Sequence, residues 1–246
     1  MARHLYAGTS GFAFKEWKGT FYPEDLSDRK MLEHYSRRLG SVEINYTFRR
    51  MPSESTLQTW REQTPDEFRF TLKAPQRITH FKKLVDAGSD VSEFVRRGLI
   101  LGDRLGTILF QLPPTLRFDR KTLVNFLESL PPKIRYCMEF RHKSWKDGEV
   151  LDLLSEHSVA LCGADTDDEP LDSIPVTAPH CYLRLRKQEY GQDELDLWAG
   201  RVGGVLSAGR DVYCYFKHEG GGVGPKYALR VLEKVKGYKP VAATAG

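Results

Sequence analysis

The stretch CYLRLR at residues 181–186 carries the pattern that decides the fold. Its apolar residues alternate with Tyr182, Arg184 and Arg186, and successive strand residues point to opposite faces. One face is therefore suited to pack under helices, whereas the other presents a tyrosine and two arginines. In a closed parallel barrel, the second face points into the interior.

Similar short stretches, rich in β-branched and aromatic residues, recur along the chain and predict eight strands, at 5–8, 42–45, 68–73, 107–112, 135–140, 159–162, 181–186 and 212–217. Apolar residues at helical spacing separate most of them, as in residues 123–130. Residues 166–180 are the exception, because Pro170, Pro175 and Pro179 leave no room for a long helix. We therefore predict an α/β fold, a (β/α)8 TIM-type barrel with a degenerate sixth helix, with a doubly wound open sheet as the alternative.

Several local signals predict where helices begin. Asp28 is a plausible cap for a helix that starts near residue 31, and Asp90 with Glu93 resembles a capping box. Pro225 suits the first turn of the last helix. Further helices are expected at 53–63 and 192–206.

Length and composition fit one barrel domain over residues 1–246, with 237–246 expected to be a frayed tail. The chain has 246 residues, 40% of them hydrophobic and 28% charged, and a net charge of +4, which excludes disordered and fibrous classes. No apolar run is long enough to span a membrane, and no signal peptide precedes the first strand, so a cytoplasmic location is expected. Residues 8–11 match neither a dinucleotide-binding nor a P-loop motif.

The four cysteines lie in apolar runs and form no C-x-x-C pair. We expect buried free thiols at Cys137, Cys162, Cys181 and Cys214, with a zinc site or a disulfide as the alternative.

Applying the same alternation to the other strands gathers polar residues at their C-terminal ends, where barrel enzymes place their chemistry. The predicted constellation is Glu43, Asn45, Lys73, Gln111, Glu139, Arg141, Arg184, Arg186 and Lys217, with Asp165 just beyond the sixth strand. Its cations outnumber its carboxylates by two, which favours an anionic ligand. The alternative is a self-satisfied ionic plug without a ligand.

Several motifs in this set resemble those of the YecE-like family, known as domain of unknown function 72. They are Gly8-Thr9-Ser10-Gly11-Phe12 with Trp17, Gly19 and Phe21-Tyr22-Pro23; Val42-Glu43-Ile44-Asn45 with Thr47-Phe48 and Pro52; Phe70-x-x-Lys73-Ala74-Pro75 with Ile78-Thr79-His80; Phe110-Gln111-Leu112-Pro113-Pro114; Glu139-Phe140-Arg141-His142 with Ser144-Trp145; and Tyr182-x-Arg184. The resemblance runs from residue 6 to about 236. It implies a TIM-type barrel and no established activity; broad labels for the family lean towards sugar-isomerase-like barrels, which is an analogy.

The chain departs from the family pattern twice. It reads Leu185-Arg186-Lys187 where many members have His-Gly, and Phe216-Lys217-His218-Glu219 where many have Phe-Asn-Asn. Both departures add positive charge at the mouth of the barrel, so substrate choice is expected to differ.

The predicted catalytic residues are Glu43 and Glu139, as a general acid/base pair, and Lys73, which orients the substrate or forms a Schiff base. The alternative is that both glutamates are only ion-paired. Glu43 would then pair with Lys73, and Glu139 with Arg141 or Arg184. The predicted substrate-binding residues are Asn45, Gln111, Arg141, His142, Arg184, Arg186, Lys217, Ser10, Trp17 and Trp145.

A divalent metal is a possible cofactor. His80, His142 and His218 follow three strands and, with the acidic residues named above, carry suitable ligand atoms. No H-x-H or H-E-x-x-H spacing is present, so no metal ligand is assigned.

The sequence thus predicts an isomerase- or hydrolase-like enzyme that acts on a small anionic, hydroxylated substrate such as a phosphorylated sugar. One alternative is a protein that binds or processes nucleic acid. It would use the basic doublets at residues 49–50, 82–83 and 96–97, and the aromatic loop at residues 12–22. The other alternative is a ligand sensor without catalysis.

Overall fold

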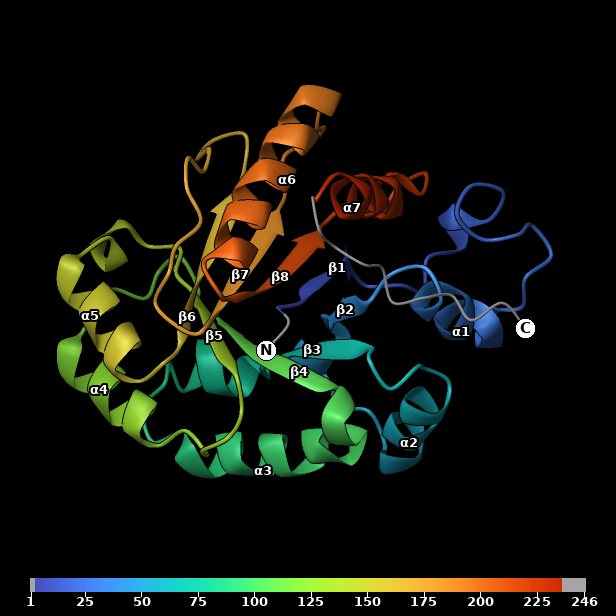
Figure 1. Cartoon of the computed structure of the whole chain (residues 1–246). Coiled ribbons are helices and arrows are strands. Elements are labelled where there is room, and N and C mark those ends of the chain that lie inside the picture. Colours follow the sequence, from blue (N-terminus) through green and yellow to red (C-terminus); the bar gives the residue numbers. More distant parts are fainter. Residues whose placement is uncertain (1–2, 236–246) are drawn as a thin grey trace.

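Eight parallel strands close into a barrel in chain order in the computed structural model, which describes residues 3–235 (Figure 1). All eight predicted strands are present: β1 Leu5–Ser10, β2 Ser41–Ile44, β3 Arg69–Lys73, β4 Leu105–Gln111, β5 Tyr136–Glu139, β6 Ala160–Asp165, β7 His180–Leu185 and β8 Asp211–Phe216. The open-sheet alternative is therefore excluded. Pairing of β1 with β8 closes the ring and leaves no unpaired edge.

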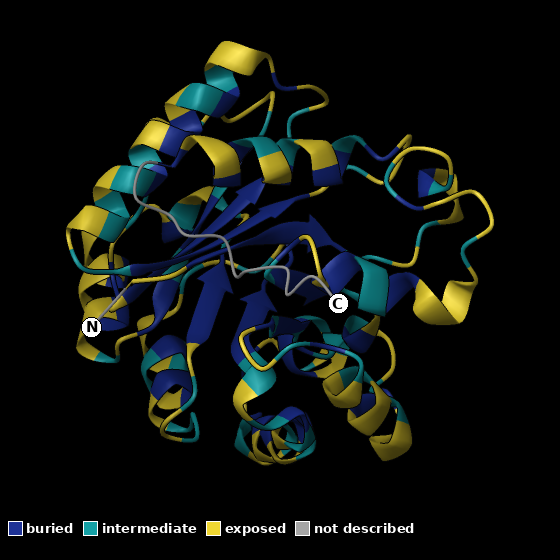
Figure 2. Cartoon of the chain, turned by 45° about the vertical axis from the view of Figure 1, so that its right-hand side comes forward, coloured by how far each residue is buried: buried dark blue, intermediate teal, exposed yellow. Residues whose placement is uncertain are grey.

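Helices cover the outside of the barrel: α1 Met31–Ser36, α2 Glu54–Glu62, α3 Gly88–Gly98, α4 Arg120–Glu128, α5 Gly148–Glu156, α6 Gln192–Ser207 and α7 Val223–Lys234. Short 3₁₀ or π turns lie in several of the loops. Figure 2 shows the buried strands enclosed by helices whose outer faces are exposed. None of these helices is long and apolar enough to cross a bilayer.

The connection from β6 to β7 has no helix, as the three prolines predict. It is held by polar contacts instead: Asp165 Oδ1 accepts the Leu171 N–H at 2.9 Å, and Thr177 Oγ1 accepts the Leu161 N–H at 2.8 Å. Beside it lies a pocket of about 490 Å³ lined by residues 176–179 and by the ends of α5 and α6. This pocket is at the end of the barrel where the strands begin, opposite to the predicted site.

The barrel interior is filled as the strand alternation predicts. Its lower layers are mostly apolar and aromatic: Tyr6, Leu109, Cys137, Ala160, Cys162, Ala178, Tyr182, Tyr213 and Tyr215. The four cysteines are buried and free, which confirms the expected thiols. The alternation that places these residues inside also directs the polar residues above them to one end of the barrel.

Two predicted helix caps are wrong. The residues from Asp28 form a 3₁₀ turn before α1, and the Asp28 carboxylate contacts Lys15 and Lys18 rather than capping a helix. Helix α3 begins at Gly88, so Asp90 and Glu93 lie inside it; both carboxylates bind nearby cations instead of free backbone N–H groups. Pro225 does occupy the first turn of α7. The expected frayed tail at 237–246 lies outside the described residues.

Candidate functional site

One arginine joins two carboxylates from different parts of the barrel wall. Arg184 on β7 donates from Nη2 to Glu43 Oε1 on β2 at 2.9 Å, and from Nη1 to Glu139 Oε2 on β5. All three side chains are at most 2% exposed. Such a buried group is tolerated only when charge and hydrogen bonds are satisfied together.

Glu43 receives further donors from three strands or their ends. Tyr182 OH donates to Oε2 at 2.6 Å, and Ser10 Oγ donates to Oε1 at 2.7 Å. Asn45 Nδ2 adds a longer bond of 3.2 Å to Oε1. Burial raises the pKa of Glu43, but Arg184 and the two hydroxyl donors outweigh it and hold the pKa below the ordinary value. Glu43 is therefore ionised at neutral pH.

Glu139 is held as an anion even more strongly. Its Oε1 accepts from Gln111 Nε2 at 2.7 Å and from Arg141 Nε at 3.2 Å. Burial raises the pKa of Glu139, but Arg184 and Arg141 more than offset it and lower the pKa to about 2. A carboxylate with this pKa is a weak base at neutral pH, which weighs against the predicted general acid/base role.

Lys73, at the end of β3, has the opposite character. Its Nζ donates to Gln111 Oε1 at 2.7 Å and lies 4.2 Å from the centre of the Phe48 ring. Burial and the charge of Arg184 lower its pKa to about 8, although Glu43 and Glu139 act against them. Lys73 therefore exchanges its proton near neutral pH, as a general acid/base group must.

A rim of cations surrounds this cluster: Lys73, Arg141, Arg186 and Lys217. We call the rim and the buried Glu43–Arg184–Glu139 group the barrel mouth. Lys217 has no hydrogen bond or ion pair with any side chain among residues 3–235. Buried polar atoms of Asn45, Arg184 and Arg186 also have no partner there. The mouth thus contains five cations and two carboxylates, an excess larger than the sequence predicted.

The difference arises from Asp165, which does not join the mouth. Its Oδ2 accepts from Tyr190 OH at 2.9 Å and lies 3.9 Å from Lys187 Nζ, outside the barrel interior. Cys162 on the same strand points inward, so strand alternation places Asp165 on the outer face.

The two tryptophans predicted to bind substrate are buried in loop packing. Trp17 is fully buried and tilts against Phe14 in the aromatic first loop. Trp145 is 5% exposed and stacks on Phe140 at 4.2 Å. Neither ring presents a face to the mouth, and the residues of the first loop pack on one another rather than forming an open surface.

The three histidines considered as metal ligands each make contacts of their own and do not contact one another. His142 Nδ1 accepts the Ser144 N–H at 3.1 Å, and His218 Nε2 donates to the Lys187 carbonyl at 2.7 Å. His80 packs edge-on against Phe48. Within residues 3–235 no three His, Cys, Asp or Glu side chains are grouped to hold a metal ion.

Two contributors to the mouth were not among the predicted site residues. Tyr182 donates to Glu43, and its inward position follows from the alternation in residues 181–186. Phe48 covers the Lys73 amine from the loop after β2. No pattern within the loop sequence could reveal that contact, because it depends on how two loops pack together.

The chain matches the family model described as protein of unknown function DUF72 over residues 6–245. This chain belongs to the DUF72 family. The resemblance found in its motifs is thereby confirmed.

Among curated DUF72-like relatives, the UPF0759 protein YecE of Escherichia coli K12 is 39% identical over 153 residues, which cover 61% of this chain and 55% of that protein. The UPF0759 protein YunF of Bacillus subtilis is 24% identical over 149 residues, covering 57% of this chain and 52% of that protein. The matched parts therefore span about half the length of these relatives.

Solved DUF72 structures share the fold over nearly the whole chain. A DUF72 protein of Thermotoga maritima is 27% identical with a TM-score of 0.75, covering 95% of this chain and 100% of that one. A DUF72 protein of Enterococcus faecalis is 17% identical with a TM-score of 0.77, covering 94% and 95% respectively. The TIM-type barrel predicted for this chain is thus that of its family.

Replacing Arg184 by methionine should destabilise the protein by about 3–5 kcal/mol at pH 7, because two buried carboxylates lose their counter-ion. In the wild type, the lowered pKa values of Glu43 and Glu139 give stability that is present above their unfolded values and is lost as the pH falls toward 2. In the variant, the two buried carboxylates lack a counter-ion and must take up protons to stay buried. The loss of stability relative to the wild type should therefore shrink when the pH is lowered from 7 to about 4.5. Urea unfolding at both pH values measures this.

The matched control is Arg186→Met, one residue beyond the end of β7 and with the same inward parity. Its ion pair with Glu139 is long, at 3.5 Å. We therefore expect the free energy of unfolding to change by about 1 kcal/mol or less. Equal losses in the two variants would contradict the central role of Arg184.

Lys73 should titrate near pH 8 while exposed lysines titrate near their ordinary pKa of about 10.4. Reductive ¹³C-methylation followed by NMR gives one resonance for each dimethyl-lysine. The resonance that moves near pH 8 should be absent from Lys73→Gln. A low-pKa resonance that persists in this variant would assign the effect to another lysine.

Proposed function

We propose that the barrel mouth binds a small anionic, hydroxylated molecule such as a phosphorylated sugar and acts on it as an isomerase- or hydrolase-like enzyme. The observation that carries this proposal is the uncompensated charge: five cations and two carboxylates converge at one end of the barrel. Half-buried cations such as Lys73 and Arg186 recover lost solvation when an anion binds them.

A self-satisfied ionic plug explains only the lower part of this arrangement. Arg184 with Glu43 and Glu139 forms a nearly closed set of hydrogen bonds, which leaves the Arg184 Nε without a partner among residues 3–235. The rim above it does not, because Lys217 and Arg186 have few or no partners among the described residues. We infer that the plug is the floor of a binding site.

The geometry supports a division of roles. Lys73 is the group suited to transfer a proton, since its pKa lies near 8. Gln111 carries an amide group that is hydrogen-bonded to Lys73, and Asn45 carries one that is hydrogen-bonded to Glu43; both amides can orient hydroxyls. Glu43 and Glu139 are then positioning residues, which hold Arg184 and set the local field, rather than the acid/base pair expected from the sequence.

Phosphorylated sugars should raise the melting temperature of the wild type, whereas the same sugars without phosphate should not. Ribose 5-phosphate against ribose and glucose 6-phosphate against glucose are suitable pairs. Arg141→Gln should reduce the shift without lowering the melting temperature of the free protein by more than a few degrees. Lys121→Ala, on the outer face of α4, should leave the shift unchanged.

Absence of any shift with all anions tested would contradict the proposal. Binding without turnover of any bound compound would favour the ligand-sensor alternative.

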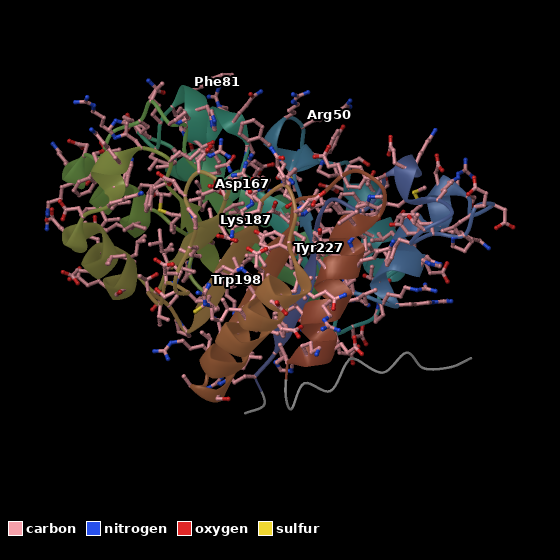
Figure 3. All side chains as sticks on the ribbon, turned by 90° about the horizontal axis from the view of Figure 1, so that it is seen from above. Arg50, Phe81, Asp167, Lys187, Trp198 and Tyr227 are labelled. Carbon is pink, nitrogen blue, oxygen red and sulfur yellow. The ribbon has the colours of Figure 1, made fainter. Side chains whose placement is uncertain are left out.

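A nucleic-acid partner is the second candidate, favoured by exposed aromatic residues beside Arg49, Arg50 and Lys83. Lys82 does not add to this surface charge, because it is paired with Asp90 at 2.7 Å. Tyr46 is 56% exposed near Arg49 and Arg50, and Phe81 is 71% exposed beside residues 82–83. In Figure 3, Arg50 and Phe81 lie along the same edge of the molecule. The third doublet, residues 96–97, does not contribute, because Arg96 pairs with Glu93 and Arg97 donates to the Pro52 carbonyl.

If this surface binds single-stranded DNA, anisotropy of a labelled oligothymidine should rise at low salt, and affinity should fall steeply with added salt. Tyr46→Ala with Phe81→Ala should weaken that binding. No binding at low salt would eliminate this candidate.

A further inference from the structure

Two of the rim cations, Arg186 and Lys217, directly follow the ends of the adjacent strands β7 and β8. Leu185 on β7 is paired with Phe216 on β8, so Arg186 and Lys217 follow at the same level. The Lys217 N–H donates to the Leu185 carbonyl at 3.1 Å, which fixes this register beyond the strands themselves. Both residues share the inward parity of Arg184 and Tyr215, so their side chains face the mouth together.

Lys217 has no carboxylate partner among residues 3–235, and Arg186 has one weak contact. The ion pair of Arg186 with Glu139 is a long 3.5 Å contact, and the buried Arg186 Nε has no partner. Burial and the charge of Arg186 lower the pKa of Lys217, with Glu219 as the opposing group. Two like charges held side by side raise the free energy of the empty site, and an anion between them removes that cost.

The backbone that carries the pair is fixed by several bonds. The Arg186 N–H donates to the Asp165 carbonyl at 2.8 Å. On the far side of Lys217, His218 contacts the Lys187 carbonyl and Trp17 Nε1 donates to the Glu219 carbonyl at 2.8 Å. A site that is held in place before binding loses little ordering entropy when the ligand arrives.

The opposite side of the mouth has different chemistry. Lys73 and Gln111 form one hydrogen-bonded pair on β3 and β4, across the barrel from β7 and β8. The amide and amine there suit hydroxyl groups, whereas a pair of cations suits a dianion. In barrels of this type, phosphate sites are frequently built from the loops after the seventh and eighth strands.

We propose that Arg186 and Lys217 form the subsite for a phosphate monoester, so that the ligand lies across the mouth with its hydroxylated part at Lys73 and Gln111. This deepens the proposed function and rests on it, because it assigns an orientation to the same ligand. Arg186 and Lys217 then bind the phosphate, whereas Arg141 remains paired with Glu139.

Calorimetric titration of inorganic phosphate and of ribose 5-phosphate tests this orientation. Compared with the wild type, Arg186→Gln with Lys217→Gln should weaken binding of both probes by about 100-fold or more, because two charge-assisted hydrogen bonds are lost and each is worth about tenfold or more. Lys73→Gln should leave inorganic phosphate binding within about threefold, a difference below one hydrogen bond. The single variants Arg186→Gln and Lys217→Gln should each show part of the loss.

Lys187→Gln is the matched control. It is next to Arg186 in sequence, but its Nζ pairs with Glu194 at 2.9 Å and lies near Asp165, away from the rim pair. Figure 3 shows Lys187 near Asp167 on the loops of this end of the barrel. We expect unchanged affinity for both probes.

The outcomes separate the two proposals. Wild-type binding that the double variant retains would overturn the phosphate subsite and leave the proposed function standing. Loss of inorganic phosphate binding in Lys73→Gln alone would reverse the orientation and also overturn the subsite. No binding of either probe to the wild type would overturn both. Circular dichroism checks that each variant is folded. If the double variant does not fold, Lys217→Gln alone still tests the subsite, because Lys217 is exposed and its replacement should not disturb the fold.

Discussion

The contact on which the barrel interior depends is the pair of ion bridges from Arg184 to Glu43 and Glu139. Without the arginine, two carboxylates would face each other in a space that water scarcely reaches. Without the carboxylates, a guanidinium would be buried alone. Each charge is acceptable only because the other strands deliver its partner, so closure of the barrel and formation of this cluster are one event.

The same contact decides which groups remain available for chemistry. Arg184 offsets one of the two negative charges on the glutamates, and the four cations above them leave the mouth with a net excess of three positive charges. It also lowers the pKa of Lys73 through space, although no bond joins the two residues. A structural element at the floor thus prepares a titratable amine and an anion-binding rim above it. The tyrosine layer below, at Tyr182, Tyr213 and Tyr215, keeps this charged layer away from the other end of the barrel.

The sequence predicted the fold and most of the mouth because strand alternation admits no intermediate state: a residue points in or out. Glu43, Gln111, Glu139 and Arg184 were found this way. Asp165 was misplaced because it was taken by proximity to a strand end, whereas counting on from the inward Cys162 puts it outside. Trp17 and Trp145 were misjudged because a loop sequence does not tell whether a ring meets a ligand or another ring. The ion pairs of Glu139 with Arg141 and Arg184 were an alternative that the sequence left open, because strand alternation places these side chains together but does not show whether their attraction outweighs burial of the carboxylate.

The helix-free connection between β6 and β7 gives the barrel an uneven wall. Elsewhere an amphipathic helix seals the strands, but here a proline-containing loop, held by Thr177 and Asp165, lies beside a pocket of about 490 Å³. Segments with few buried apolar contacts open with a smaller free energy than the core. Backbone amides of β6 should therefore exchange with solvent earlier than those of β2 or β4.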